Sequence, residues 1–139
     1  MTLLRAVFDT NVLVSALISE GLCDTLLEEA NAGKFLVCVS PFILRELERV
    51  LHNKFKYSSD EVRSALLLIR QASQIIDPKE MGIKLERISR DPDDDHILAA
   101  AIASGADFII TGDLDLLHLK TFRSISILAP RDFLMKFES

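Results

Sequence analysis

The stretch RDPDDDHILAAAIASGADFIITGDLDLL, residues 90–117, combines start and stop signals for a helix, a short apolar strand and a series of aspartates. Asp91 and Pro92 are typical of a helix N-terminus, and Gly105 is typical of the residue that ends a helix. The run DFIIT, residues 107–111, has the length and composition of a buried strand. The stretch therefore predicts a helix that ends at Gly105 and leads directly into a strand.

The same alternation of strands and helices continues outward from this stretch. Short apolar runs predict strands, and apolar residues at helical spacing predict helices between them. The expected strands are residues 3–8, 35–39, 74–76, 107–111 and 124–128. The other expected helices are residues 10–19, 22–32, 79–88 and 130–137. Two more helices are expected to begin at Ser40 and at Ser59. Strands that are apolar on both faces are typical of a parallel sheet covered by helices. We predict a three-layer, Rossmann-like α/β/α domain with a central parallel sheet of about five strands.

The composition indicates a single domain. With 139 residues and 49% hydrophobic content, residues 1–139 are long enough to bury one sizeable core. The longest apolar run, residues 97–103, is far shorter than the roughly 20 residues that cross a bilayer. The N-terminal run, residues 3–8, carries an arginine in its middle and does not resemble a secretory signal. Cys23 and Cys38 lack CxxC spacing and are expected to be reduced. We expect a cytosolic protein without membrane association.

The charge balance limits how the protein can bind nucleic acid. The net charge is −5 and the sequence pI is about 5.2, which argues against binding by bulk electrostatics alone. A local basic strip comprises Arg45, Arg49, His52, Lys54 and Lys56, interleaved with Phe55 and Tyr57. Such a strip can grip an RNA backbone and stack a base, or it can be a solvated helix end whose cations complement the helix dipole. The sequence leaves both interpretations open.

Acidic residues follow two of the predicted strands where each strand ends. Asp9 follows the first strand in the sequence FDTN, and Asp113 and Asp115 follow the fourth in TGDLD. In an open parallel sheet, ligands bind beyond the carboxyl ends of the strands, where the strand order reverses. We therefore expect these carboxylates to converge at one edge of the sheet.

The acids at the start of the helix in residues 90–117 have a simpler alternative role. Asp91 is an expected N-cap, and Asp93 and Asp94 in the first turn complement the helix dipole. Asp95 lies beyond the first turn and four residues after Asp91, a like-charge spacing that costs a few tenths of a kcal/mol. Asp95 is therefore the acid of this helix that we expect to serve a site.

A cluster of carboxylates needs a compensating partner. Two carboxylates about 4 Å apart repel by about 4 kcal/mol at an effective dielectric constant of about 20, so the cluster must be protonated or hold a cation. Ligation by oxygen alone favours Mg²⁺ or Mn²⁺. A calcium-binding EF-hand loop is excluded, because His96 stands where that loop needs glycine and Ile102 where it needs glutamate.

Four segments, in their order and spacing, resemble the PIN domain family, and within it the small prokaryotic toxin-like proteins of toxin–antitoxin systems. They are FDTNVLVSAL (residues 8–17), SPFILRELERVL (40–51), DPDDDHILAAAIASGADFIITGDLDLL (91–117) and ILAPRDFL (127–134). The resemblance covers nearly the whole chain and implies a PIN-like fold.

The resemblance also implies a Mg²⁺- or Mn²⁺-dependent ribonuclease with a ring of catalytic acids, which leaves a 5′-phosphate and a 3′-hydroxyl. Matched to the family's motifs, the catalytic acids are Asp9, Glu46, Asp95 and Asp113. Asp94 is an alternative to Asp95, and Asp115 is a further metal ligand. Asn11 and Thr111 are supporting residues. Glu46 enters mainly on the resemblance, since its spacing alone places it in a surface charge pattern. The implied partners are an RNA substrate, an antitoxin protein and a second copy of the chain in a homodimer.

Two other functions remain open on the residues alone. A phosphatase of the haloacid dehalogenase type also uses an aspartate after its first strand, but it needs a second aspartate where Asn11 stands. An RNA- or partner-binding module that holds metal without turnover fits the same acids. For a nuclease, Asp9→Asn should abolish RNA cleavage and leave RNA binding intact.

Overall fold

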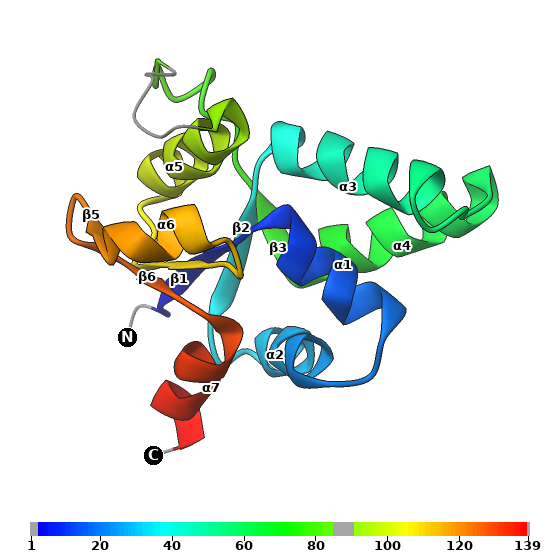
Figure 1. Cartoon of the computed structure of the whole chain (residues 1–139), viewed down its shortest axis with the longest axis horizontal. Coiled ribbons are helices and arrows are strands. Elements are labelled where there is room, and N and C mark those ends of the chain that lie inside the picture. The colour runs from blue at the N-terminus through cyan, green and yellow to red at the C-terminus, as the bar shows by residue number, and fades with distance from the viewer. Residues whose placement is uncertain (1–2, 85–90, 139) are drawn as a thin grey trace.

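The computed structural model describes residues 3–84 and 91–138. At its centre is a six-stranded sheet in the order β3-β2-β1-β4-β6-β5 (Figure 1). The strands are β1 (Arg5–Phe8), β2 (Leu36–Val39), β3 (Ser73–Ile75), β4 (Phe108–Ile110), β5 (Thr121–Phe122) and β6 (Ile125–Leu128). All neighbouring pairs are parallel except β5 and β6, which form an antiparallel edge. The predicted α/β class with a mainly parallel sheet is confirmed, and the short strand β5 is an addition to it.

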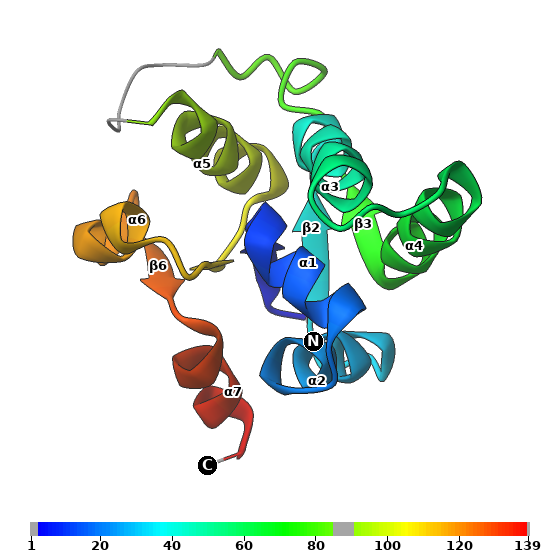
Figure 2. The ribbon, with the colours of Figure 1, turned by 45° about the vertical axis from the view of Figure 1, so that its right-hand side comes forward.

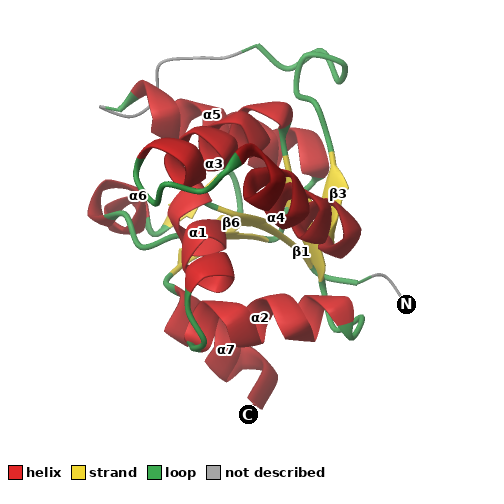
Figure 3. Ribbon diagram, turned by 90° about the vertical axis from the view of Figure 1, so that its right-hand side faces the viewer, coloured by secondary structure: helices red, strands yellow, loops and turns green. Residues whose placement is uncertain are grey.

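Helices cover both faces of this sheet. They are α1 (Thr10–Ile18), α2 (Leu22–Asn31), α3 (Pro41–Asn53), α4 (Ser59–Ala72), α5 (Pro92–Ser104), α6 (Leu114–Leu119) and α7 (Pro130–Glu138). Helices α2 and α7 lie on one side of the sheet, and α3 and α5 lie on the other (Figure 3). No single helix in the described part of the chain is long and apolar enough to cross a bilayer, and α1 and α2 meet that requirement only as a pair bent by 95°.

Burial on both faces explains the apolar sequences of the central strands. Ala6, Val7 and Phe8 of β1 are each 0% exposed. The Phe8 ring lies 6.1 Å from the Phe35 ring and 6.3 Å from the Phe133 ring, measured between centroids, and the latter two rings are 4.9 Å apart. Because Phe133 belongs to α7, this aromatic cluster fixes the C-terminal helix to the sheet.

Side-chain and backbone caps define where the helices begin and end. Before α3, Ser40 Oγ accepts the Ile43 N–H at 3.2 Å. At the start of α4, Ser58 and Glu61 form a reciprocal capping box. Gly105 ends α5 with a left-handed φ of 63°. The observed starts of α3, α4 and α5 agree with those predicted from the sequence.

Two segments differ from the predictions. The helix expected over residues 79–88 is absent from the described part of that range, because residues 78–82 form turns. Gly82 adopts a left-handed φ of 73°, which ends a helical path. The remainder of the range, residues 85–88, lies outside the described residues. Conversely, α6 is a helix that the sequence analysis did not include, since its 6 residues are too few to show a helical period.

The order of the strands reverses at β1, which pairs with β2 on one side and with β4 on the other. The segments that follow β1 and β4 therefore leave the sheet from neighbouring positions. A hydrogen bond of 2.9 Å from the Asp9 N–H to the Ile110 carbonyl oxygen joins the two strand ends. This edge of the sheet is the switch point at which open α/β folds bind their ligands.

We expect Gly105→Ala to destabilise the protein by about 1 kcal/mol, because a side chain in the left-handed region is strained. No heavy atom within 4 Å would meet the added Cβ, so the cost would come from the backbone alone. The matched control is Gly21→Ala, where φ is 174° and the added Cβ also meets nothing within 4 Å. Chemical denaturation measures both variants, and equal losses would contradict the assignment of the cost to φ at Gly105.

Candidate metal centre

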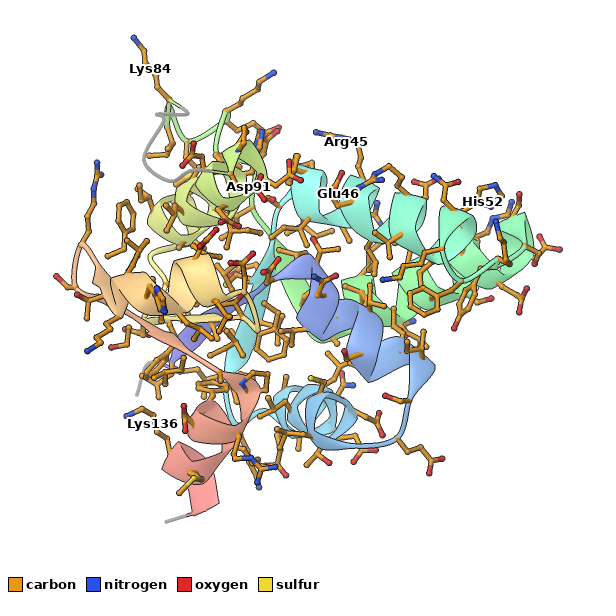
Figure 4. All side chains as sticks on the ribbon, in the orientation of Figure 1. Arg45, Glu46, His52, Lys84, Asp91 and Lys136 are labelled. Atoms are coloured by element: carbon orange, nitrogen blue, oxygen red, sulfur yellow. The ribbon has the colours of Figure 1, made fainter. Side chains whose placement is uncertain are left out.

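A cavity of about 230 Å³ lies at the carboxyl ends of β1 and β4. Six carboxylates and one guanidinium group line it, and they belong to Asp9, Glu46, Asp91, Asp93, Asp94, Asp113 and Arg49. These side chains come from four parts of the chain, and Figure 2 shows the helices α1, α3, α5 and α6 arranged around this region. Glu46 on α3 and Asp91 at the start of α5 lie in the region between these two helices (Figure 4). We call this space the acidic cavity.

Asp9 is held in one orientation by both of its carboxylate oxygens. Oδ1 accepts the Thr10 N–H at 2.7 Å, which caps α1, and Oδ2 accepts the Thr111 hydroxyl at 2.7 Å. Burial raises the pKa of Asp9, and the nearby carboxylates of Asp113 and Asp91 raise it further, while the two hydrogen bonds oppose this rise. Asp9 therefore presents a carboxyl group whose position is fixed before any ligand arrives.

Thr111 connects Asp9 to Asp113. Its side chain is fully buried, and its Oγ1 donates to Asp9 while accepting the Asp113 N–H at 3.0 Å. Asp113 in turn caps α6, because its Oδ1 accepts the N–H groups of Asp115 at 2.8 Å and Leu116 at 3.4 Å. The threonine hydroxyl thus couples the positions of two acids that are 104 residues apart in the chain.

Asp94 is the most buried acid in the acidic cavity, with 4% of its surface exposed. Its Oδ2 atom has no hydrogen-bond partner among the described residues. Burial raises the pKa of Asp94 to about 7, and the carboxylates of Asp113, Asp91, Asp9 and Asp115 add to this effect. A buried carboxylate oxygen without a partner is costly, so the site requires a proton or a cation at Asp94.

The donor set fits a hard divalent cation. Asp94, Asp113 and Asp115 each offer a carboxylate oxygen, and these oxygens lie within 4.8 Å of one another. Asp9 lines the same cavity. Ligand sets made only of oxygen are those that Mg²⁺ and Mn²⁺ prefer, and a cation would relieve the repulsion among these carboxylates.

The structure does not bring Asp95 into the acidic cavity. Asp95 is 1% exposed and lines a different cavity of about 260 Å³, together with Ile83, Lys84 and Arg123. Successive residues of an α-helix point about 100° apart, so Asp94 and Asp95 face different surroundings. The sequence analysis assigned the site to Asp95, whereas the geometry places Asp94 beside Asp9 and Asp113.

Asp91 has the N-cap geometry expected of it, Asp93 lies in the first turn as expected, and both also line the acidic cavity. Asp91 Oδ1 accepts the Asp93 N–H at 2.9 Å at the start of α5. From the sequence, Asp91 was assigned to the N-cap and Asp93 to the helix dipole, and neither was assigned to the site. The signal that this assignment passed over is the three-residue spacing of Asp91 and Asp94, which places both acids on one face of the helix.

Glu46 is paired within the acidic cavity. Its Oε1 and Oε2 atoms accept the Nε and Nη2 groups of Arg49 at 3.2 and 2.8 Å, a two-pronged arrangement. The side chain of Glu46 is 22% exposed and that of Arg49 is 58% exposed, so the pair lies at the rim. Glu46, predicted from the sequence to be catalytic, and Arg49, predicted to bind RNA, thus form one ion pair.

The remaining predicted residues divide between the acidic cavity and other surfaces. Asn11 lines the cavity, and Asp115 is exposed beside it. Lys54 and Lys56 are exposed beyond the end of α3 and do not line the cavity in the described structure. His52, which precedes them, lies at the opposite end of α3 from Glu46 (Figure 4). The basic strip therefore runs away from the acids, and among its described members only Arg49 lines the acidic cavity.

A family model described as PIN domain matches residues 5–115 of the chain. A protein of Methanocaldococcus jannaschii named "Uncharacterized protein MJ1680" is 32% identical over an alignment that covers 97% of this chain and 92% of the relative. The matched range includes every residue that the sequence analysis assigned to the site.

Two solved structures have a similar fold. VapBC2 from Rickettsia felis, bound to a DNA fragment from its promoter, is similar with a TM-score of 0.60 at 20% identity, over 89% of this chain and 97% of that one. VapC20 of Mycobacterium tuberculosis, a sarcin-ricin loop cleaving toxin, is similar with a TM-score of 0.55 at 14% identity, over 87% of this chain and 98% of that one. At these identities the likeness establishes the fold alone.

The raised pKa of Asp94 predicts how stability depends on pH without divalent cations. In the folded protein Asp94 keeps its proton up to a pH of about 7, whereas in the unfolded chain it releases it near 3.8. The folded state binds more protons between these values, so the contribution of Asp94 to the free energy of unfolding falls as pH rises through this window.

The matched variant is Asp94→Asn, which keeps the shape and removes the charge. Measured in EDTA by chemical denaturation, its stability relative to the parent should rise by about 2 kcal/mol or more between the two ends of this window. A difference that stays constant with pH would show that Asp94 titrates normally.

Proposed function

Because the chain belongs to the PIN domain family, we propose that it is a metal-dependent ribonuclease that hydrolyses RNA phosphodiester bonds, and that it acts as the toxin of a toxin–antitoxin pair. The observation that carries the proposal is the meeting of Asp9, Asp94 and Asp113 in one cavity beyond the ends of β1 and β4. On this proposal residues 1–139 form a single nuclease domain, and Mg²⁺ or Mn²⁺ is the cofactor, since all proposed ligands are carboxylate oxygens.

The side chains of the acidic cavity would share the work of hydrolysis. Asp9, Asp94 and Asp113 would hold the cation, with Asp115 as a further oxygen donor. A bound divalent cation lowers the pKa of a water ligand and offsets the charge that develops on the phosphate. Thr111 would keep Asp9 and Asp113 at a constant separation through its two hydrogen bonds. Asn11, next to Asp9 in the cavity, would support the substrate or a water molecule.

Glu46 and Arg49 would act at the rim of the cavity. The Glu46 carboxylate can accept a proton from the attacking water once it leaves its pair with Arg49, whose guanidinium can then face a phosphate oxygen. The water oxygen bonds to phosphorus and the bond from phosphorus to the 3′ oxygen breaks. The products are a 5′-phosphate and a 3′-hydroxyl, the latter taking its proton from solvent.

The proposed partners follow from the two structural neighbours. One neighbour is a sarcin-ricin loop cleaving toxin, and the other is a VapBC assembly bound to promoter DNA. By analogy of fold, we propose an antitoxin protein as the partner of this chain. A homodimer is proposed separately, on the resemblance of the sequence to the toxin-like PIN proteins. A small open reading frame for a DNA-binding protein immediately upstream of the gene would support the antitoxin part of the proposal.

A phosphatase of the haloacid dehalogenase type is disfavoured by the cavity. Asn11 lies two residues after Asp9 and lines the cavity, at the position where such an enzyme needs an acid to protonate the leaving group. An amide cannot transfer a proton in this way.

We expect RNA cleavage to require added Mg²⁺ or Mn²⁺ and to stop in excess EDTA. The control for contaminating nucleases is Asp113→Asn, purified in parallel, because asparagine can still cap α6 but supplies no charge to a cation. Cleavage of a generic RNA by the parent at an undiminished rate in EDTA would contradict the metal mechanism. Binding of RNA by the parent without cleavage in either cation would favour a binding module.

We further expect Asp94→Asn to lose about 100-fold or more in cleavage rate, and Asp95→Asn to lose much less. The reason is that Asp94 lines the acidic cavity with Asp9 and Asp113, whereas Asp95 lines a different cavity. Thermal unfolding with and without Mg²⁺ separates folding from metal binding, since a lost ligand removes the stabilisation by the cation. A larger loss of activity and of Mg²⁺ stabilisation in Asp95→Asn would return the role to Asp95.

A further inference from the structure

A second cavity, of about 480 Å³, adjoins the acidic cavity. The two cavities share Phe42, which lines both of them. The second cavity is formed by the first turns of α3, by residues 77–84 and by the side of α5 that carries His96. Its volume is within the range of pockets that bind small molecules or single groups of a polymer. We call it the flanking cavity.

Two flat rings from different helices stack at the flanking cavity. The Phe42 ring on α3 and the His96 ring on α5 lie 3.8 Å apart between centroids and are tilted by only 6°. Both side chains are half-buried, and both line the cavity. Because the two rings are brought together by the packing of α3 against α5, the stack is present before any ligand binds. A stack of this spacing can be continued by another planar ring.

The charge of the flanking cavity is opposite to that of the acidic cavity. Among the described residues, three cationic side chains, those of Arg45, Lys79 and Lys84, line it, and all three are exposed. Within the same described ranges one carboxylate lines it, that of Asp77, whose Oδ1 accepts the Lys79 N–H at 3.0 Å within a turn. Arg45 and Lys84 extend from the same side of the molecule (Figure 4). This local positive charge occurs in a chain whose net charge is −5.

We propose that the flanking cavity binds the nucleotide next to the scissile phosphate in a single-stranded segment of RNA, an inference that rests on the proposed nuclease function for the identity of the ligand. The base stacks on the Phe42–His96 pair, and Arg45 and Lys84 contact its phosphate. Phe42 stands between this nucleotide and the phosphate in the acidic cavity, so adjacent nucleotides would occupy adjacent cavities.

The combination of features favours RNA over a protein ligand and single strands over duplexes. A polynucleotide alternates flat rings and anionic groups, which suit the ring stack of the flanking cavity and the cation-holding acids of the acidic cavity, whereas an acidic peptide has no such regular alternation. A base in a duplex is already stacked on its neighbours and cannot enter such a cavity without leaving the helix.

The first experiment places the fluorescent base 2-aminopurine at successive positions of a short single-stranded RNA and measures its emission on binding, in EDTA so that no cleavage occurs. Stacking on an aromatic surface quenches this base. We expect the parent protein to quench the 2-aminopurine emission. Phe42→Leu should lose this quenching and bind the RNA about tenfold or more weakly, and Phe42→Tyr should recover both the quenching and the affinity. Equal quenching by the parent and Phe42→Leu would overturn the proposal, as would no quenching at any position.

The second experiment tests the cations with exposed side chains, whose replacement leaves the core untouched. The double variant Arg45→Gln, Lys84→Gln should weaken binding of the same RNA and reduce its salt dependence. The matched control, Arg131→Gln, Lys136→Gln, removes the same charge from exposed side chains of α7, on the opposite side of the sheet, and should retain the affinity of the parent within about twofold. Equal losses in the two double variants would overturn the assignment of the phosphate contact to the flanking cavity.

The outcomes separate this inference from the proposed function. Cleavage by the parent without quenching by any 2-aminopurine position would refute the flanking cavity and leave the nuclease intact. Quenching that depends on Phe42, without cleavage in Mg²⁺ or Mn²⁺, would support the flanking cavity and refute the nuclease. The Mg²⁺-dependent rise in melting temperature should be the same in Phe42→Leu as in the parent, because the ligands of the acidic cavity are unchanged. A lost Mg²⁺ response would contradict a role of Phe42 in base stacking alone and would assign it to the metal centre.

Discussion

The parallel pairing of β1 with β4 is the constraint on which the site depends. It brings Asp9 next to Ile110, through a hydrogen bond from the Asp9 N–H to the Ile110 carbonyl, and it makes Thr111 the first residue beyond the sheet on the neighbouring strand. From that position one hydroxyl group reaches both Asp9 and the backbone of Asp113. The separation of the two acids is therefore set by the sheet and not by flexible loops, which is the kind of support that a precise metal site requires.

Several acids of the acidic cavity have a structural role as well as a possible chemical one. Asp9, Asp91 and Asp113 are the N-caps of α1, α5 and α6. Their carboxylates satisfy N–H groups that a helix start leaves unpaired, and each such cap contributes about 1 kcal/mol. These contributions offset part of the repulsion that arises when like charges gather. In the described part of the chain Asp94 caps no helix, and burial, with the repulsion of the neighbouring carboxylates, raises its pKa to about 7.

The packing of α3 against α5 creates two cavities of opposite charge around Phe42. On one side are carboxylates from β1, α3, α5 and the loop after β4, which suit a cation. On the other side are the cations of α3 and of residues 77–84, with the Phe42–His96 stack between the helices. On the proposed function, a chain with a net negative charge can in this way hold a polyanion locally, because charges beyond about 8 Å are largely screened at physiological salt and a cation in the acidic cavity would offset the carboxylates there.

The sequence by itself determined the order of the elements and the edge of the sheet at which the acids gather. Apolar runs identified strands β1, β2, β4 and β6, and the signals at Ser40, at Asp91 and at Gly105 placed the start of α3 and both ends of α5 within a residue, because caps are local interactions. The segments read least well were those with weak local signals, namely the turns of residues 78–82 and the short helix α6.

Only the tertiary structure decided which acid of α5 faces Asp9. Asp94 and Asp95 are adjacent, equally acidic and equally helical in sequence, and their difference is a rotation of about 100° whose direction is set by how α5 packs on β1, β2 and β4. The stacking of Phe42 on His96 likewise depends on packing, between helices about 50 residues apart. The pairing of Glu46 with Arg49 differs, because residues three apart on one helix are neighbours whatever the tertiary structure. Local chemistry set the strand ends and helix caps, whereas the surroundings of each side chain followed from packing between segments distant in the chain.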